Sequence, residues 1–328
     1  SPHIFKNNTV KYSGHTGITL RDDSGGTKAH IENNVIEYAG GVGVFVRGTS
    51  NSSTINYNDI SYCGIIANSS DRTAWAHPFA HEALRIHGIN NTEVRRNVLY
   101  KSGYGLAMVV QDGREYKNVD VIHNTVFDIE SHGFDFRSGL TTGPPASSID
   151  DVIIANNIFD NVSNDPGDNI DYGMMIRHID LPGYLSKTKI HNNQFMDDGK
   201  GLGGSSWWIR NNGDSATTDN LVGMETTYSG TFSNNSESQP SFTNESTYDL
   251  TIQSGSAMRD NGTSTYTDSD VTDGNPDIGY DEFGGGGGPT NNAPVISSFT
   301  ADSTIGSAPL VVNFTCSASD DNTTAANL

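Results

Sequence analysis

The hexapeptide IENNVI, residues 31–36, places an asparagine three residues after one apolar residue and two residues before another. The spacing apolar-x-x-Asn-x-apolar occurs seven times, and successive asparagines are 26, 24, 39, 27, 33 and 36 residues apart. A repeat of about 24 to 27 residues, lengthened in places by insertions, predicts a solenoid of stacked coils. The repeated asparagines are Asn8, Asn34, Asn58, Asn97, Asn124, Asn157 and Asn193.

Each asparagine is followed by a second signature, a small residue that opens a short strand of alternating character. The first and third residues after the small residue are apolar in every copy, and the leucine spacing of leucine-rich repeats is absent. We therefore expect an all-β, right-handed parallel β-helix whose coils stack about 4.8 Å apart. The asparagines are expected to form a ladder of side-chain amides. The strands are residues 17–21, 43–47, 83–87, 105–109, 133–137, 173–177 and 206–210.

The repeat fades after Asn193, which divides the chain into parts. We assign residues 1–283 to the β-helix and the glycine-rich stretch 284–292 to a flexible linker. Residues 293–328 contain two alternating stretches, 293–299 and 308–314, but are too few to close a β-sandwich. We interpret the chain as a fragment of a longer precursor whose second domain is cut off.

The excess of acidic residues makes nucleic acid and anionic membranes unfavourable partners. The 328 residues carry 39 acids and 19 bases, a net charge of −20, which disfavours nucleic acid and anionic membranes. No apolar run is long enough to span a membrane. Ten N-glycosylation sequons and only two cysteines, Cys63 and Cys316, favour an extracellular or cell-surface protein without a disulfide framework. We expect a monomer.

The fourth position after the small residue forms a column of positive charge. Five of its seven members are arginine, although the chain has only 11 arginines, and none is lysine. Like charges on adjacent strands repel, so an anionic ligand would offset the repulsion, and arginine suits bidentate binding of carboxylate or sulfate. The alternative is that each arginine pairs with a loop acid such as Asp22, Asp112 or Asp180. The column is Arg21, Arg47, His87, Val109, Arg137, Arg177 and Arg210.

The second-position column brings Arg85 and Asp135 onto the same predicted face, where we expect Asp135 to be exposed. Long insertions at 63–81 and 138–150 flank these central coils and predict a binding groove. The candidate catalytic residues are Asp135, Asp112, Glu82, Arg85, His87 and Arg137. The candidate substrate-binding residues are Arg21, Arg47, Arg177, His178, Trp208 and Trp75.

Two ways of cutting an acidic polysaccharide fit these residue types. Hydrolysis needs two carboxyl groups about 5 to 9.5 Å apart, with Asp135 paired to Asp112 or Glu82. Elimination needs a cation beside the uronate carboxylate and a base, roles for which Arg85, His87, Arg137 and His178 are candidates.

We expect no required cofactor. The stretch 268–277 and Asp22-Asp23 are rich in the oxygen ligands of Ca²⁺, but their spacing matches no EF-hand loop. No His/Cys cluster has zinc spacing, and no glycine-rich phosphate loop is present.

The coils, the asparagine column and the ending PDIGYDEF (276–283) resemble the pectate-lyase-like superfamily of right-handed β-helix proteins that cut or bind polysaccharides. Residues 293–328 look like the first half of a PKD-type sandwich. Together with the sequons, this arrangement is similar to surface proteins of methanogenic archaea, and to their disaggregatase family in particular. That resemblance implies a chondroitin-like substrate containing glucuronate and N-acetylgalactosamine.

The sequence thus favours a secreted glycoside hydrolase that depolymerises a uronate-containing polysaccharide. A lyase acting by elimination is the first alternative. A non-catalytic adhesin or matrix protein that holds glycan in the arginine groove is the second.

Overall fold

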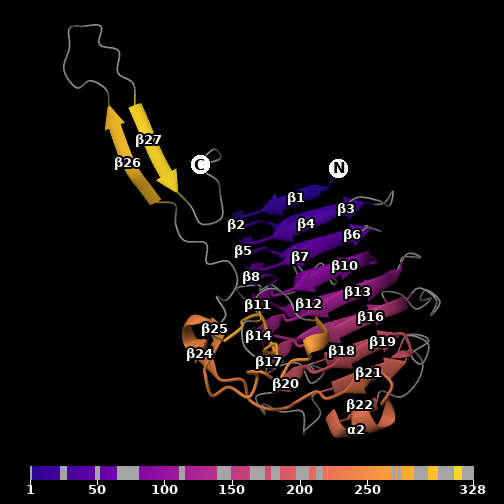
Figure 1. Ribbon diagram of the computed structural model, residues 1–328. Coiled ribbons are helices and arrows are strands. Elements are labelled where there is room, and N and C mark those ends of the chain that lie inside the picture. Colours follow the sequence, from indigo (N-terminus) through magenta and orange to yellow (C-terminus); the bar gives the residue numbers. More distant parts are fainter. Residues whose placement is uncertain are drawn as a thin grey trace, which may run out of the picture. The chain divides into compact units, whose positions relative to one another are not determined.

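A computed structural model describes most of the chain (Figure 1). The described residues are 2–22, 28–48, 52–64, 81–110, 115–138, 149–162, 174–178, 185–196, 207–211, 217–219, 221–266, 271, 275–283, 295–301 and 314–319. Contacts divide the chain into two compact units, Ser1–Gly285 and Gly286–Leu328.

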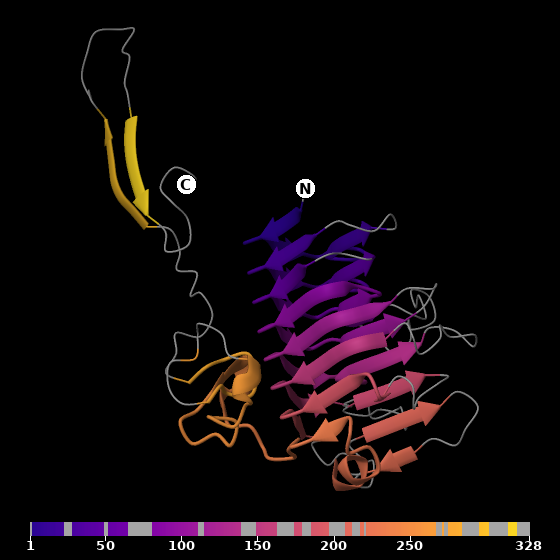
Figure 2. The ribbon, with the colours of Figure 1, turned by 45° about the vertical axis from the view of Figure 1, so that its right-hand side comes forward.

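Three large sheets build the β-helix of the first unit, and their strands stack in the order of the coils (Figures 1 and 2). All pairings within them are parallel except that of β22 with β21. Sheet A contains β1 (His3–Lys6), β4 (Ala29–Glu32), β7 (Ser53–Asn56), β10 (Asn90–Arg95), β13 (Tyr116–Ile122), β16 (Ile149–Ala155), β19 (Thr188–His191) and β23 (Phe232–Ser233). Sheet B contains β2 (Thr9–Lys11), β5 (Val35–Glu37), β8 (Asp59–Ser61), β11 (Val98–Tyr100), β14 (Thr125–Ile129), β17 (Ile158–Val162) and β20 (Gln194–Met196). Sheet C contains β3 (Ile18–Asp22), β6 (Val44–Gly48), β9 (Glu82–His87), β12 (Tyr104–Val110), β15 (Phe134–Ser138), β18 (Met174–His178), β21 (Trp207–Asn211) and β22 (Thr217–Asp219).

The predicted asparagine ladder forms the corner between sheets A and B. The Asn97 Oδ1 accepts the backbone N–H of Asn58 at 3.0 Å and the Asn58 side-chain amide at 2.8 Å. The same pair of bonds links every successive rung. The residue before each ladder asparagine, such as Arg96 (φ 52°) or His123 (φ 55°), is left-handed, which turns the chain sharply between the two strands.

The ladder is one rung longer than predicted and has a distinct end. Asn235 adds an eighth rung by accepting from Asn193. The Glu225 carboxylate, on the short helix α2 (Leu221–Thr227), then accepts both the backbone N–H and the side-chain amide of Asn235. A carboxylate therefore takes the place that the next asparagine would fill.

Close packing explains the small residue that opens each strand of sheet C. A Cβ on Gly17, Gly43 or Gly105 would lie 2.3–2.6 Å from the carbonyl oxygen of the equivalent residue in the next coil. These three coils therefore have no room for a side chain at this corner, where the third coil has the small residue Ala83. The interior is filled by apolar side chains from all three sheets, and Phe159 stacks on Phe195 with 4.9 Å between ring centroids.

Residues 242–266 and 275–283, which we call the clasp, fold back onto the outer face of sheet B. The clasp contains β24 (Phe242–Asn244), η2 (Glu245–Thr247), β25 (Asp249–Ile252) and η3 (Ser264–Tyr266). Phe242, Leu250, Ile252, Met258 and Ile278 of the clasp form a second apolar cluster. Phe127 and Ile158 are the buried residues of sheet B in that cluster. The outer face of sheet B is therefore an apolar interface in the central coils.

The ending DIGYDEF (277–283) anchors the clasp to one buried cation. The guanidinium of Arg96, from the ladder corner, lies 3.2 Å from the Glu282 carboxylate and donates to the Tyr280 carbonyl at 2.8 Å. Both charged side chains are essentially inaccessible to solvent. Gly279 (φ 108°) approaches so closely that a Cβ would lie 2.6 Å from Ile158 Cδ1, which explains the glycine in this motif.

The second unit is described in two strands, β26 (Val295–Ala301) and β27 (Phe314–Ser319), which pair antiparallel. Apart from Phe314, the predicted strand 308–314 lies outside the described residues. Within the described part of the chain, no helix has the length and apolar character that crossing a membrane requires.

Breaking the ladder in the middle is expected to destabilise the whole β-helix. The Asn124→Ala variant leaves the buried donors of Asn97 and two backbone carbonyl groups without their partner. We expect the free energy of unfolding, measured with urea, to fall by roughly 3–5 kcal/mol. The exposed Asn261→Ala serves as the control, and equal midpoints for the two variants would contradict a structural role for the ladder.

Removing the buried cation is expected to loosen the clasp. Arg96→Met leaves the Glu282 carboxylate buried without its guanidinium, which costs roughly 3–5 kcal/mol. Limited proteolysis should then cut within residues 242–283 faster than in the wild type. Adding Glu282→Gln should recover part of the loss, whereas Lys187→Met, which removes an exposed ion pair with Asp150 of β16 in sheet A, should change little.

Candidate functional site

The strands of sheet C bring the predicted arginine positions into register, as expected from the repeat. Arg21 pairs with Arg47, and Arg47 pairs with His87, across β3, β6 and β9. Further along the sheet, Arg137 pairs with Arg177, and Arg177 pairs with Arg210. The arginines of the first three coils define a candidate site.

Arg21, Phe45 and Arg85 form a stack on the three adjacent strands β3, β6 and β9. We call this stack, together with Arg47, the arginine cluster. The guanidinium carbons of Arg21 and Arg85 lie 5.4 and 5.5 Å from the centroid of the Phe45 ring. Such cation–π contacts hold a guanidinium flat and leave its N–H edge for a planar anion. Arg21 is exposed, Arg47 is half-buried, and the Arg85 side chain is 12% exposed.

Glu82 and His87 lie at the two ends of β9, beside the arginine cluster. The Glu82 carboxylate lies 3.7 Å from Arg85 Nη1 and accepts the backbone N–H of His81 at 3.0 Å. The His87 ring lies 6.5 Å from the Phe45 ring, between centroids. Both residues are buried. The structure therefore brings together Glu82, Arg85 and His87 from the predicted set.

The expectation that Asp135 is exposed is wrong. Asp135 does follow the alternation of β15, opposite Ala107 of β12, but its accessible surface is 0%. Ala107 and Val109, which occupy the outward columns of β12, are buried as well. Alternation fixes the direction of a side chain but not its exposure, and the outer face of sheet C is covered in its central coils.

Register also separates Asp135 from Glu82. Asp135 is level with Arg85 but two strands away, and Glu82 begins β9 three residues earlier. Strand spacing and rise place the two Cα atoms roughly 14 Å apart. The two residues are therefore not arranged as the carboxyl pair of a glycosidase.

The remaining predicted residues lie further along sheet C or outside the described residues. Arg137 lies on β15, Arg177 and His178 on β18, and Trp208 on β21, all in sheet C. Asp112 and Trp75 lie outside the described residues, as do Asp180 and most of the stretch 268–277. Among the described residues, no group of three or more His, Cys, Asp or Glu side chains is arranged to hold a metal ion.

Exposed aromatic rings occur instead near the ends of the sheet B strands. Tyr12 and Tyr38 are 75% and 41% exposed, and their rings stack on each other with 4.9 Å between centroids. Tyr62 continues the stack at 4.7 Å from Tyr38. Because the ring faces contact one another, this stack offers mainly ring edges to a ligand.

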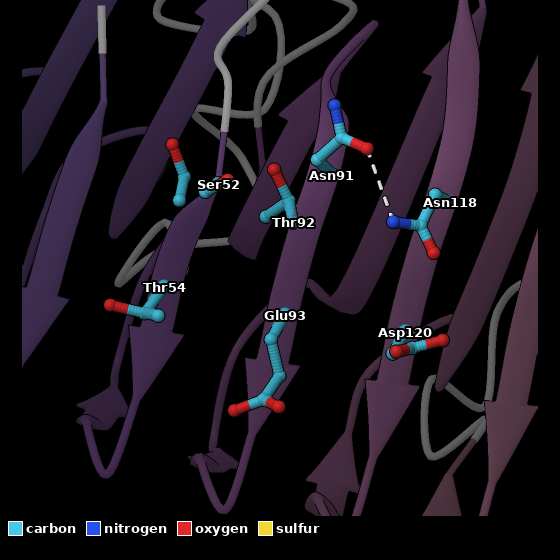
Figure 3. A pocket seen from close by; sticks show the side chains of 8 residues that line it. Ser52, Thr54, Asn91, Thr92, Glu93, Asn118 and Asp120 are labelled. Atoms are coloured by element: carbon cyan, nitrogen blue, oxygen red, sulfur yellow. Dashed lines mark hydrogen bonds between the residues drawn. The ribbon is translucent and has the colours of Figure 1, made fainter.

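A second candidate site is an open polar hollow on the outer face of sheet A (Figure 3). It has a volume of about 330 Å³ and spans β7, β10 and β13. Glu93 and Asp120, paired across adjacent strands, lie together in it. Burial, and then the nearby charges of Glu93 and Asp151, raise the pKa of Asp120. The lining residues are Ser52, Ser53, Thr54, Asn91, Thr92, Glu93, Asn118 and Asp120.

The sequence did contain a signal for this hollow. The residue four positions before each ladder asparagine faces outward on sheet A, and this column contains Glu93 and Asp120 in consecutive coils. The predicted outward columns came only from the strands that follow the asparagines, and not from the strands that precede them. The two carboxyl groups were therefore missed.

Other carboxyl groups with raised pKa values belong to the outer face of sheet B and the clasp. Burial raises the pKa of Asp59 to about 6, and a hydrogen bond with Tyr100 opposes the shift. Burial also raises the pKa of Glu282 to about 7, against the opposing effect of Arg96. Burial raises the pKa of the free Cys63 thiol to about 12, which makes it a poor nucleophile.

Comparison with known proteins supports the fold. Residues 1–159 match the family model described as the right handed beta helix region. Searches of curated proteins and of solved structures gave no match. The match and the three parallel sheets confirm an all-β, right-handed parallel β-helix, a fold that is common in polysaccharide-degrading enzymes.

The raised pKa of Asp59 predicts a pH-dependent stability. A folded-state pKa of about 6, above the ordinary 3.8, gives stability that is complete below pH 3.8 and is lost as the pH rises through 6. Asp59→Asn removes this loss, so at pH 7.5 the variant should be roughly 2–3 kcal/mol more stable than the wild type, with little gain at pH 4. Urea unfolding at both pH values is the measurement, with the exposed Glu245→Gln as control. An Asp59→Asn gain of equal size at both pH values would contradict the assignment.

Proposed function

We propose that the protein is a secreted depolymerase that cleaves glycosidic bonds of a uronate-containing, chondroitin-like polysaccharide at the outer face of sheet C. The fold supports a carbohydrate-active role because right-handed β-helices are common in polysaccharide-degrading enzymes. The observation that carries the substrate class is the arginine cluster. It places Arg21 and Arg85 against one phenylalanine ring, with Arg47 in register beside Arg21, in a chain with a net charge of −20.

The cluster suits the carboxylate or sulfate groups of such a polymer. Guanidinium groups held against Phe45 keep their donors in one plane, which matches the geometry of a carboxylate. The register repeats arginine along the sheet at the strand spacing, as a groove for an extended chain requires. We place the anionic sugars along this column and the bond to be cut beside β9.

Hydrolysis, the chemistry favoured by the sequence, would use Asp135 as one carboxyl group and Asp112 as the other, since Glu82 is offset from Asp135. β-Elimination is the second candidate, and the neighbouring positions of Arg85 and His87 on β9 favour it. In that reaction Arg85 would neutralise the uronate carboxylate, and His87 would accept the C5 proton once substrate reaches it. The electron pair of the C5–H bond would form the C4=C5 double bond as the C4–O bond breaks, and the departing oxygen would take a proton from water.

The products of digestion distinguish these mechanisms. Incubation with chondroitin should release small saccharides. Absorbance near 235 nm identifies the unsaturated uronate of elimination, and new reducing ends without it identify hydrolysis. No release of saccharides under any ionic condition would contradict the depolymerase and favour a glycan-binding protein without activity.

The arginine cluster is expected to act in binding. Arg21→Ala removes an exposed guanidinium, and we expect a rise in KM of roughly tenfold with a smaller change in kcat, because one charge-assisted contact is lost. The exposed Lys28→Ala is the control for lost charge alone. An unchanged KM in Arg21→Ala would exclude the cluster from substrate binding.

A further inference from the structure

The hollow on sheet A arises from an irregularity that three coils share. Ser52, Asn91 and Asn118 all have left-handed backbones, with φ of 58°, 48° and 54°. Asn91 and Asn118 occupy matching positions in β10 and β13, between the pairs Asn90–Lys117 and Thr92–Val119, so the same left-handed residue recurs in neighbouring strands without a shift of register. A left-handed residue interrupts the alternation of a strand, and here the Asn91 and Asn118 side chains lie at the border of the hollow (Figure 3).

The side chains of the hollow present both hydrogen-bond donors and acceptors. At one end the Asn118 amide donates to Asn91 Oδ1 at 3.1 Å, an exposed contact that leaves the other amide atoms facing solvent (Figure 3). At the other end Glu93 and Asp120 are cross-strand neighbours, so their Cβ atoms are about 5 Å apart. The Glu93 carboxylate accepts from the Asn56 amide at 3.1 Å, which fixes its position.

The charge of the hollow selects against the ligand proposed for sheet C. Two of its eight lining residues are acids and none is a base, and the neighbouring Arg95, whose Nε lies 3.8 Å from the Glu93 carboxylate, is only 12% exposed. The surface of the hollow therefore disfavours a uronate or a sulfated sugar. The other six are neutral serine, threonine and asparagine side chains. A carboxylate accepts hydrogen bonds through both oxygens, and amide groups both donate and accept, which suits adjacent hydroxyl groups.

We propose that this hollow is a second carbohydrate site, which binds a neutral sugar residue through its hydroxyl and amide groups. Glu93 and Asp120 accept hydrogen bonds from the sugar hydroxyls, and Asn91 and Asn118 bond the opposite side of the ring. Its volume of about 330 Å³ lies at the lower end of the range of small-ligand sites. The site is independent of the arginine cluster and does not require that the protein cut glycans.

Carboxyl footprinting of the wild-type protein tests the site without any substitution. Carbodiimide coupling with glycine ethyl ester labels accessible carboxylates, and mass spectrometry locates the label. The probes are chitotriose as a neutral N-acetylhexosamine oligomer, cellotriose as a neutral hexose oligomer, and a chondroitin tetrasaccharide as the anionic one. We expect a neutral probe at millimolar concentration to reduce labelling of Glu93 and Asp120 at least twofold. The labelling of Glu37, on sheet B, should not change.

Variants then test the contacts by calorimetric titration of the same probes. Glu93→Gln and Asp120→Asn should each weaken binding of the neutral oligomer roughly tenfold, since each replaces a charged acceptor. Glu37→Gln is the matched control and should bind as the wild type does. Unfolding midpoints identify any variant whose loss of binding reflects misfolding.

Three results would overturn the proposal: no protection by either neutral probe, equal protection of Glu37, or unchanged affinity in both folded hollow variants. The outcome is separable from that of the proposed function. Loss of neutral-sugar binding in Glu93→Gln with normal depolymerisation supports two sites, and failure of depolymerisation with intact neutral-sugar binding rejects only the enzyme.

Discussion

The whole β-helix depends on the pair of hydrogen bonds that joins each ladder asparagine to the next. One carbonyl oxygen accepts both a backbone N–H and a side-chain amide from the preceding coil, and the remaining amide hydrogen reaches a backbone carbonyl. This arrangement satisfies the polar groups of a tight buried corner and sets the vertical position of each coil. Insertions of different length are tolerated because every coil returns to the same corner. Outward-facing side chains on the sheets can therefore differ from coil to coil without changing how the coils stack.

The ladder and the inward columns could be predicted from the sequence because they repeat with the coil. The eighth rung, Asn235, was not recognised because Glu237 stands where the other seven copies have an apolar residue two positions after the asparagine. Exposure was harder to predict. Asp135 has the expected direction but is buried, since alternation describes one strand and burial depends on everything packed outside it. Likewise, the partners Arg96 and Glu282 are 186 residues apart and share no local pattern.

The three outer faces of the solenoid have different chemical characters. Sheet C carries guanidinium groups stacked on Phe45, sheet A carries the acidic and neutral hollow, and sheet B is covered by the clasp over its central coils. An overall charge of −20 gives no hint of this division. Our two proposals follow from it, because an anionic sugar is favoured on one face and disfavoured on another. A polysaccharide of alternating anionic and neutral residues would offer a ligand to both.

The clasp also has a consequence for how the protein is made. Coils form from neighbouring stretches of chain, so those at the start can stack while synthesis continues. The central coils are different, because Phe127 and Ile158 stay uncovered and Arg96 lacks its counter-charge until Glu282 has left the ribosome. During that interval the growing molecule exposes an apolar strip beside an unneutralised cation. Completion of the β-helix is thus a late event, governed by its last motif.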